Sequence, residues 1–253
     1  MTSANLFKRS AIGGAVLLCA ASTSLAGTVQ VQFDSNIFNG VVNPAYDAVS
    51  LFYPGGQSAN VGAGRFQGTI KGYSGVNPII FVDGLDDLFM YCYDLYEGVW
   101  GGRTVDYTIN FEGEHGRALD FLGAVNSVLN QGKTGDQYDK FAWLHPANGH
   151  VAAAVQLGLW ESKYENDGWN IASGSFRATG IETNTSTWLN SFFNAVGPSA
   201  SLDGKYVMTL EAKGAQDMIT GDPPGQVPEP GSLALVAAAG LGLMATRRRR
   251  AAK

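Results

Sequence analysis

The sequence is poor in charged residues and almost without cysteine. Only 15% of its 253 residues are charged, and its two cysteines are Cys19 and Cys92. All 22 acidic residues lie between Asp34 and Glu229, where ten basic residues leave a net charge of −12. A region with this much negative charge repels the phosphates of nucleic acids, which excludes DNA or RNA binding. Glycine, by contrast, is abundant, with 33 residues, which indicates a chain with many turns. Aromatic residues make up 11% of the sequence, which indicates a folded protein rather than a disordered one.

The N-terminus has the pattern of a secretory signal peptide. Lys8 and Arg9 precede an apolar run at 11–21, and a small residue then stands on either side of Leu25. We therefore expect residues 1–26 to be removed after Ala26. This cleavage discards Cys19, so the exported protein keeps a single thiol.

The C-terminus combines a Pro-Glu-Pro motif, an apolar stretch at 233–246 and a basic tail. The residues concerned are Val227, Pro228, Glu229, Pro230, Arg247, Arg248, Arg249 and Arg250. This order resembles the PEP-CTERM sorting signal. The resemblance implies a Gram-negative exported protein that an exosortase-type protease processes, held transiently in the inner membrane and then displayed on the cell surface or released outside the cell. A permanent single-span anchor is the alternative interpretation.

Between these ends the sequence predicts strands first and helices later. Period-two patterns predict strands at 28–33, 48–53, 65–73, 79–82, 88–96, 104–111 and 205–211, and helical spacing predicts helices at 118–129, 138–144, 148–164 and 187–196. We expect an α+β fold, a glycine-rich antiparallel β-sandwich or barrel with a helical segment inserted at about 116–196. The domain would cover 27–219, followed by a Gly/Pro linker at 220–227 and the sorting segment, with its short membrane helix, at 228–253.

Cys92 and Gln156 are the unusual residues of the body. A lone thiol is exceptional in an exported protein, because that compartment oxidises thiols. Gln156 stands in the apolar helical run Val151–Trp160, where an unpaired buried amide costs free energy. Either residue has a plain explanation: Cys92 as a small buried apolar side chain, and Gln156 as a partner for the backbone of a neighbouring strand. Alternatively, the two side chains have condensed into a thioester.

The motifs Tyr91-Cys92 and Gln156-Leu157-Gly158-Leu159-Trp160 resemble those of the Cys–Gln thioester domains of bacterial surface adhesins, although Gly158 and Leu159 replace alanine and isoleucine. The resemblance implies a Cys92–Gln156 crosslink, with the two side chains in contact, shielded by Tyr91, Tyr93, Trp143 and Trp160. It also implies covalent attachment to an amine-bearing surface protein or exopolysaccharide. Such binding occurs once, so no enzyme activity, cofactor or metal is expected. The alternative is a structural or polysaccharide-binding matrix protein that binds without a covalent bond.

Other residue groups give weaker signals. His115, His145 and His150 have no zinc-site spacing, and the acidic run at 83–87 lacks a calcium-loop pattern. Glu112 and Glu114 have no further support as a glycosidase pair. Trp100 and Trp169, which stand among glycine and polar residues, are the candidates for a sugar-stacking surface.

Overall fold

The protein is described here from a computed structural model that covers residues 27–39, 44–111, 113, 115–197 and 200–223. The signal peptide and the sorting segment predicted above lie outside these residues. The strands are β1 Thr28–Phe33, β2 Asp47–Tyr53, β3 Gln57–Ala63, β4 Phe66–Ser74, β5 Leu88–Cys92, β6 Thr104–Asn110, β7 Arg177–Thr179, β8 Val207–Glu211 and β9 Met218–Gly221. The α-helices are α1 Gly116–Leu129, α2 Gly149–Tyr164 and α3 Thr183–Ala195, and short 3₁₀ turns are η1 Pro78–Ile80, η2 Gly135–Gln137, η3 Ala142–Leu144 and η4 Gly204–Tyr206.

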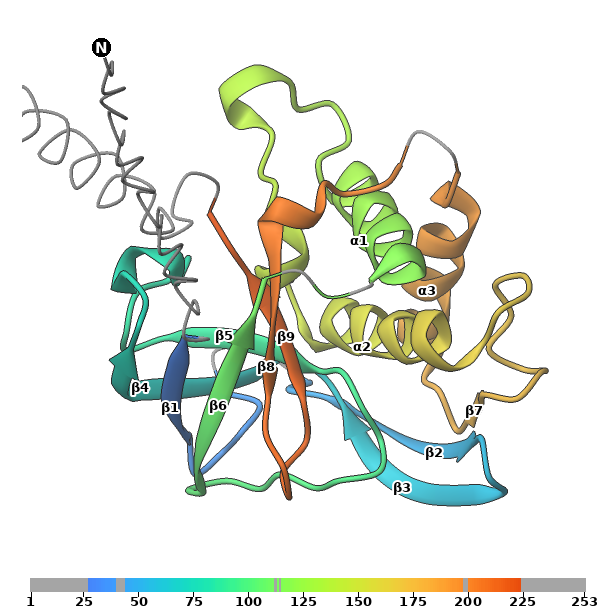
Figure 1. The fold of residues 1–253 in the computed structure, drawn as a ribbon. Helices are drawn as coiled ribbons and strands as arrows, with labels where there is room; N and C mark the ends of the chain where they lie inside the picture. Colours follow the sequence, from blue (N-terminus) through green and yellow to red (C-terminus); the bar gives the residue numbers. More distant parts are fainter. Residues whose placement is uncertain (1–26, 40–43, 112, 114, 198–199, 224–253) are drawn as a thin grey trace, which may run out of the picture. The chain divides into compact units, whose positions relative to one another are not determined.

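Six strands close into an antiparallel barrel in the order β1-β4-β5-β9-β8-β6 (Figure 1). The C-terminal hairpin β8–β9 inserts between β5 and β6, so the last strand of the described chain pairs with β5. Buried positions alternate with exposed ones in β6 and mainly with half-buried ones in β1, as the period-two patterns predicted. The prediction of an α+β fold is confirmed, and of the two expected architectures the structure has the barrel.

The helices lie together on one side of the barrel, and α2 lies between α1 and the small sheet of β2 and β3 (Figure 1). This helix contacts α1, α3 and the small sheet β3-β2-β7, and 13 of its residues are buried. A helix enclosed on all sides is apolar all round rather than amphipathic, which explains the long apolar run that contains Gln156. Gly158 makes the close packing possible, because a Cβ there would lie 1.9 Å from the ring of Phe121.

Several predicted elements differ from the structure. The strand predicted at 79–82 is wrong, since Pro78–Ile80 forms a 3₁₀ turn that Asn77 caps. The helix predicted at 138–144 is reduced to the turn η3. Strand β3 was not predicted, and β9 extends to Gly221, two residues into the segment expected to be a linker.

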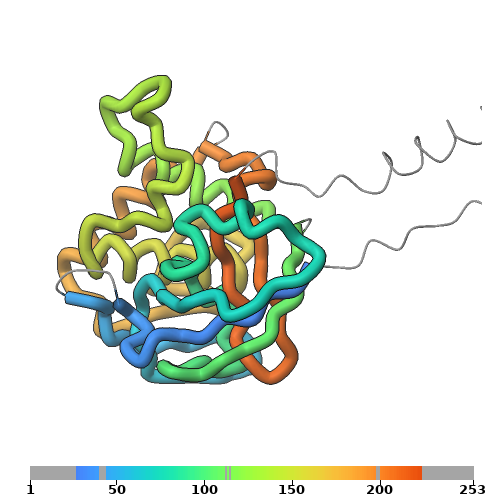
Figure 2. The backbone as a smooth tube through the Cα atoms, turned by 90° about the vertical axis from the view of Figure 1, so that its left-hand side faces the viewer, coloured from blue at the N-terminus to red at the C-terminus, as the bar shows by residue number. Residues whose placement is uncertain are grey.

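The segment between α1 and η3 projects from the body, and both views show it as a protruding loop (Figures 1 and 2). Its residues from 131 to 138 are exposed. Among the described residues, no helix has the length and apolarity needed to cross a membrane. The apolar stretch at 233–246 lies outside them.

Candidate functional site

Gln156, in the middle of α2, binds the backbone of Cys92 at the end of β5. Its Nε2 donates to the Cys92 carbonyl oxygen at 2.8 Å, and its Oε1 accepts from the Cys92 N–H at 2.9 Å. Strand β4 pairs with β5 up to Phe66 opposite Met90 and does not extend to Cys92. The side-chain amide therefore takes the place that a further strand residue would have. The fold thus brings Cys92 and Gln156, 64 positions apart, into contact. The contact is the one expected if Gln156 pairs with the backbone of a neighbouring strand.

The Cys92 thiol has a different partner. Its Sγ lies 2.9 Å from Oε1 of Gln216, to which it donates a hydrogen bond. Because a C=O bond is about 1.2 Å long, the carbonyl carbon of Gln216 lies no farther than about 4.1 Å from the sulfur. Sequence reasoning did not single out Gln216, which lies in the turn between β8 and β9.

A network of hydrogen bonds fixes this turn against the end of β5. The side chain of Gln216 donates from Nε2 to the Asp94 carbonyl oxygen at 3.0 Å. The backbone carbonyl oxygen of Gln216 accepts from the Tyr107 hydroxyl, also at 3.0 Å. The next residue, Asp217, accepts from the Tyr93 N–H at 2.7 Å through its backbone carbonyl. The Asp94 carboxylate in turn accepts from the Asp217 N–H. Barrel closure by β8–β9 is thus what presents a carboxamide to the thiol.

Cys92 and Gln216 both line a cavity of about 440 Å³. Its walls are otherwise mostly apolar and come from Ile37, Phe38, Ala59, Val61, Gly62, Phe66, Leu95, Gly98, Val99 and Trp160, with Glu97 beside them. Cys92 is only 1% exposed, whereas Glu97 and Gly98 are exposed. The cavity therefore leads from the surface to a buried sulfur atom.

The four aromatic residues expected around the thiol have different places. Trp160 lines the cavity. Tyr91 and Trp143 are fully buried and pack on each other, with ring centroids 5.9 Å apart and the Tyr91 hydroxyl donating to the Trp143 carbonyl oxygen. Tyr93 faces another way, with its hydroxyl 3.1 Å from Nδ1 of His115 and its ring under Nζ of Lys163.

Burial determines the state of the free thiol. It raises the pKa of Cys92 well above the ordinary value, and the nearby negative charge of Asp94 raises it further. A thiol with a raised pKa stays protonated at neutral pH and is a poor nucleophile toward molecules in solution. Its chemistry is therefore limited to groups that the fold holds against it.

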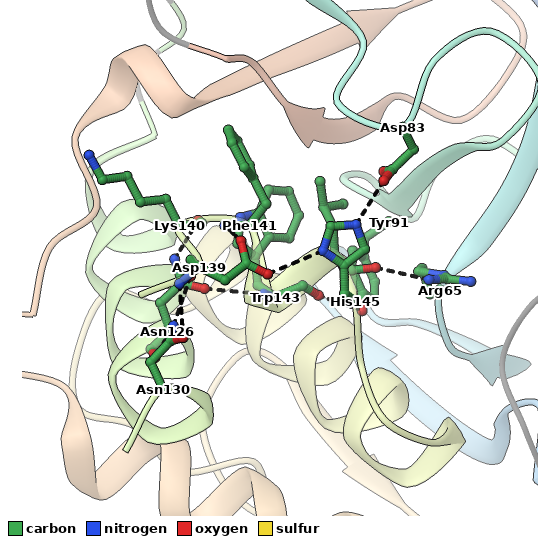
Figure 3. A network of polar contacts seen from close by, with 11 residues as sticks. Arg65, Asp83, Tyr91, Asn126, Asn130, Asp139, Lys140, Phe141, Trp143 and His145 are labelled. Carbon is green, nitrogen blue, oxygen red and sulfur yellow. Dashed lines mark hydrogen bonds and ion pairs between the residues drawn. The ribbon is translucent and has the colours of Figure 1, made fainter. Parts of the chain in front are cut away.

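A second polar network fastens the segment around η3 to α1 and to the barrel (Figure 3). Asn126 accepts from the Trp143 N–H, and Arg65 donates to the Leu144 carbonyl oxygen while its guanidinium lies over the ring of Phe89. At the surface, His145 lies between two carboxylates. Its Nε2 is 2.8 Å from Asp83, and its Nδ1 is 3.4 Å from Asp139.

Replacement of His145 by glutamine should alter how stability depends on pH. The hydrogen bond to Asp83 is the largest of the effects that raise the pKa of His145. A raised pKa in the folded state stabilises the protein fully below the unfolded pKa of about 6.5, and this stabilisation is lost as the pH rises through the folded value. We expect His145→Gln to cost less than about 1 kcal/mol at pH 5.5, because the side chain is 36% exposed, and still less at pH 8.5. Urea unfolding at both pH values measures this, and a difference independent of pH would contradict it.

The remaining candidate residues do not gather into one site. The three histidines have separate partners: His115 contacts Tyr93, His145 the two aspartates, and His150 contacts Thr185 and Glu182. In the part of the chain that the structure describes, no group of three or more His, Cys, Asp or Glu side chains is placed to hold a metal ion. Glu112 and Glu114 lie outside it. Trp169 stacks on Phe121, whereas Trp100 is 60% exposed.

Comparison with known proteins identifies the C-terminal segment. A family model of the PEP-CTERM protein-sorting motif matches residues 226–250. The chain carries a PEP-CTERM sorting motif. The prediction made from the Pro-Glu-Pro sequence and the arginine tail is thereby confirmed, and the PEP-CTERM motif indicates an exported surface protein that an exosortase processes. No curated protein and no solved structure matches the chain, so no relative supports the resemblance of the body to thioester domains.

Proposed function

We propose that this exported PEP-CTERM protein attaches covalently to amine-bearing partners through an internal thioester between Cys92 and Gln216. The observation that carries the proposal is the 2.9 Å contact between Cys92 Sγ and Gln216 Oε1 at the inner end of a cavity that reaches the surface. Gln156, which the sequence motifs suggested as the acyl donor, instead holds the backbone of Cys92 with both ends of its amide. In this proposal Gln156 orients the thiol, and Gln216 reacts with it.

Formation of the bond needs no reagent beyond the two side chains. Sγ attacks the carbonyl carbon of Gln216, the new C–S bond replaces the C–N bond, and the thiol proton leaves with the amide nitrogen as ammonia. The amide nitrogen already donates to the Asp94 carbonyl oxygen, which holds the carboxamide in place for the attack. The neighbouring hydrogen bonds hold the turn that carries Gln216 against the end of β5, which carries Cys92.

The thioester then acts as a stored acyl group. A primary amine that enters the cavity attacks the same carbonyl carbon, the C–S bond breaks, and the sulfur takes a proton to become a thiol again. The partner ends up joined to residue 216 by an amide bond. Since the thioester is not regenerated, the protein binds once and is not an enzyme. The partner would be a surface protein or an exopolysaccharide that carries free amines.

The mass of the exported protein tests the proposal. With the thioester intact, the protein should weigh one ammonia less than its processed sequence. Methylamine should add its full mass and at the same time make Cys92 reactive toward a thiol reagent, because the sulfur leaves as the acyl group transfers. A mass equal to the sequence, together with a protein that gains no methylamine and a Cys92 that is alkylated after unfolding whether or not methylamine was added, would refute the thioester.

The second candidate function is reversible binding to a matrix polysaccharide, and exposed aromatic rings favour it. Tyr96 and Trp100 are 59% and 60% exposed, and aromatic faces of this kind can stack on sugar rings. Binding of this kind would be lost when Trp100 is replaced by alanine and unchanged in a Cys92→Ala variant. Covalent attachment has the opposite pattern.

A further inference from the structure

We propose that Glu97 makes the thioester cavity selective for positively charged amines and rejects amines that carry a carboxylate of their own. This inference rests on the proposed thioester and concerns which amines reach it. Among the described residues that line the cavity, Glu97 is the charged one, and the others besides Cys92 cannot ionise. Two further charges lie near this cavity without lining it: the Asp94 carboxylate, which acts on the Cys92 thiol, and the Arg103 guanidinium, which donates to the carbonyl oxygens of Gly98 and Gly214. Of the three, only Glu97 lines the cavity, so its carboxylate is the charge that an entering amine meets directly.

The carboxylate of Glu97 is held close to the reactive turn. Its Oε1 accepts a hydrogen bond from the N–H of Gly214 at 2.8 Å, two residues before Gln216 in the same turn. The backbone of Glu97 is itself fixed, because Asp94 Oδ1 accepts from the N–H groups of Tyr96 and Glu97 at 3.0 and 3.2 Å. Glu97 thus connects the segment after β5 with the turn that carries the acyl donor. Its position relative to Gln216 is a property of the fold, not of a freely moving surface side chain.

Glu97 distinguishes incoming amines by their charge. A lysine-type amine, with a pKa of about 10.4, arrives from water as an ammonium ion. The apolar walls offer it no polar partner, whereas the Glu97 carboxylate attracts it at the entrance. The ammonium must then lose its proton to water before its nitrogen attacks the carbonyl carbon. An amine that also bears a carboxylate is repelled at the same point.

The charge of the whole body acts in the same direction. The stretch between Asp34 and Glu229 carries 22 acidic and ten basic residues, and a surface of this sign speeds the approach of cationic partners and slows that of anionic ones. The substrate class is therefore an alkyl amine in surroundings free of carboxylates, such as a lysine side chain on a basic protein surface. Free amino acids and acidic amino-bearing polymers are poor substrates.

Two amines of similar size separate this effect from general reactivity. n-Propylamine and β-alanine both present a primary amine on a short unbranched chain, but β-alanine adds a carboxylate. The measurement is the ratio of their rates of thioester aminolysis in the exported protein at low ionic strength, followed by intact mass. We expect the wild type to favour propylamine and Glu97→Gln to reduce this ratio about fivefold, which is the effect of one charge at roughly 4 Å in water. Glu97→Asp should keep most of the preference.

Two controls keep the test decisive. Asp136→Asn removes one negative charge from the projecting loop at η2 and should leave the ratio unchanged. In the wild type, raising the salt concentration from 0.05 to 0.5 M should reduce the ratio, because salt screens the charges that an approaching amine meets. The salt effect shows that the preference is electrostatic, and the comparison of Glu97→Gln with Glu97→Asp assigns it to this carboxylate. An unchanged ratio in Glu97→Gln, or a wild-type ratio insensitive to salt, overturns the selectivity but leaves the thioester standing. Failure of the wild type to react with either amine overturns the thioester itself.

Discussion

Replacement of Gln216 by alanine is expected to abolish the loss of ammonia and the reaction with methylamine completely. The acyl carbon is then absent, so the mass of the variant equals that of its sequence and Cys92 remains a free thiol. Gln216→Glu is the matched variant: it keeps the size of the side chain but presents a carboxylate, which a thiol does not attack. Cys92→Ala removes the other end of the bond and should give the same result.

These variants should fold, which makes their loss of reactivity informative. The Gln216 side chain is not among the fully buried ones, and Tyr107 bonds to its backbone carbonyl, which every substitution keeps. The measurement is intact mass before and after methylamine, with urea unfolding as the check on the fold. If Gln216→Ala still loses ammonia while a folded Gln156 variant does not, Gln156 is the acyl donor after all, as the sequence motifs suggested.

Local patterns in the sequence predicted the larger elements of the fold. The strands near 28–33 and 104–111 alternate because one face of each lies in the barrel core, and the helix at 149–164 begins at Asn148, whose side chain caps the Val151 N–H. The helix predicted at 138–144 is wrong because only Ala142, Trp143 and Leu144 are buried there, in a 3₁₀ turn. The side chains of Asn126 and Asn130 hold this segment by hydrogen bonds to its backbone. Strand β3 contains Ser58, Asn60 and Gly62, and so has no clear alternation of apolar residues.

The candidate site could be predicted in part, for a physical reason. A lone thiol in an oxidising compartment and an amide in an apolar helix both need an explanation, and this singled out Cys92 and Gln156. The structure places the Gln156 amide against the backbone of Cys92, while the thiol contacts Gln216. Which side chain the Cys92 sulfur contacts depends on how the barrel closes. Barrel closure depends in turn on strand pairing between residues far apart in the sequence. Gln216 is a polar residue in a turn, and nothing in its own surroundings in the chain distinguishes it from other turn residues.

Replacement of Gln156 by leucine should destabilise the protein strongly, whatever the chemistry of the thiol. Gln156 is fully buried, and its amide is the partner of both the N–H and the carbonyl of Cys92. Leucine fills similar space but leaves two buried backbone groups unpaired, at about 1–3 kcal/mol each. We expect a loss of about 2–6 kcal/mol in the free energy of unfolding, a large part of the stability of an ordinary domain. Urea unfolding measures it, and a loss below about 0.5 kcal/mol would show that these backbone groups find other partners.

Gln156→Glu is the matched control, because its effect should depend on pH in a way that leucine cannot reproduce. A protonated carboxyl has one donor and one acceptor, the same pair that the amide presents to Cys92. An ionised carboxylate accepts at both oxygens and cannot donate to the Cys92 carbonyl, so burial here should raise the folded pKa of the new carboxyl above its unfolded value of about 4.3. A raised folded pKa stabilises the protein below the unfolded value, and this stabilisation disappears as the pH rises through the folded one. Gln156→Glu should therefore be closer to the wild type at pH 4.5 than at pH 8, while the deficit of Gln156→Leu stays nearly constant between these values. Equal pH dependence of the two variants would mean that the residue 156 side chain does not pair with the Cys92 backbone.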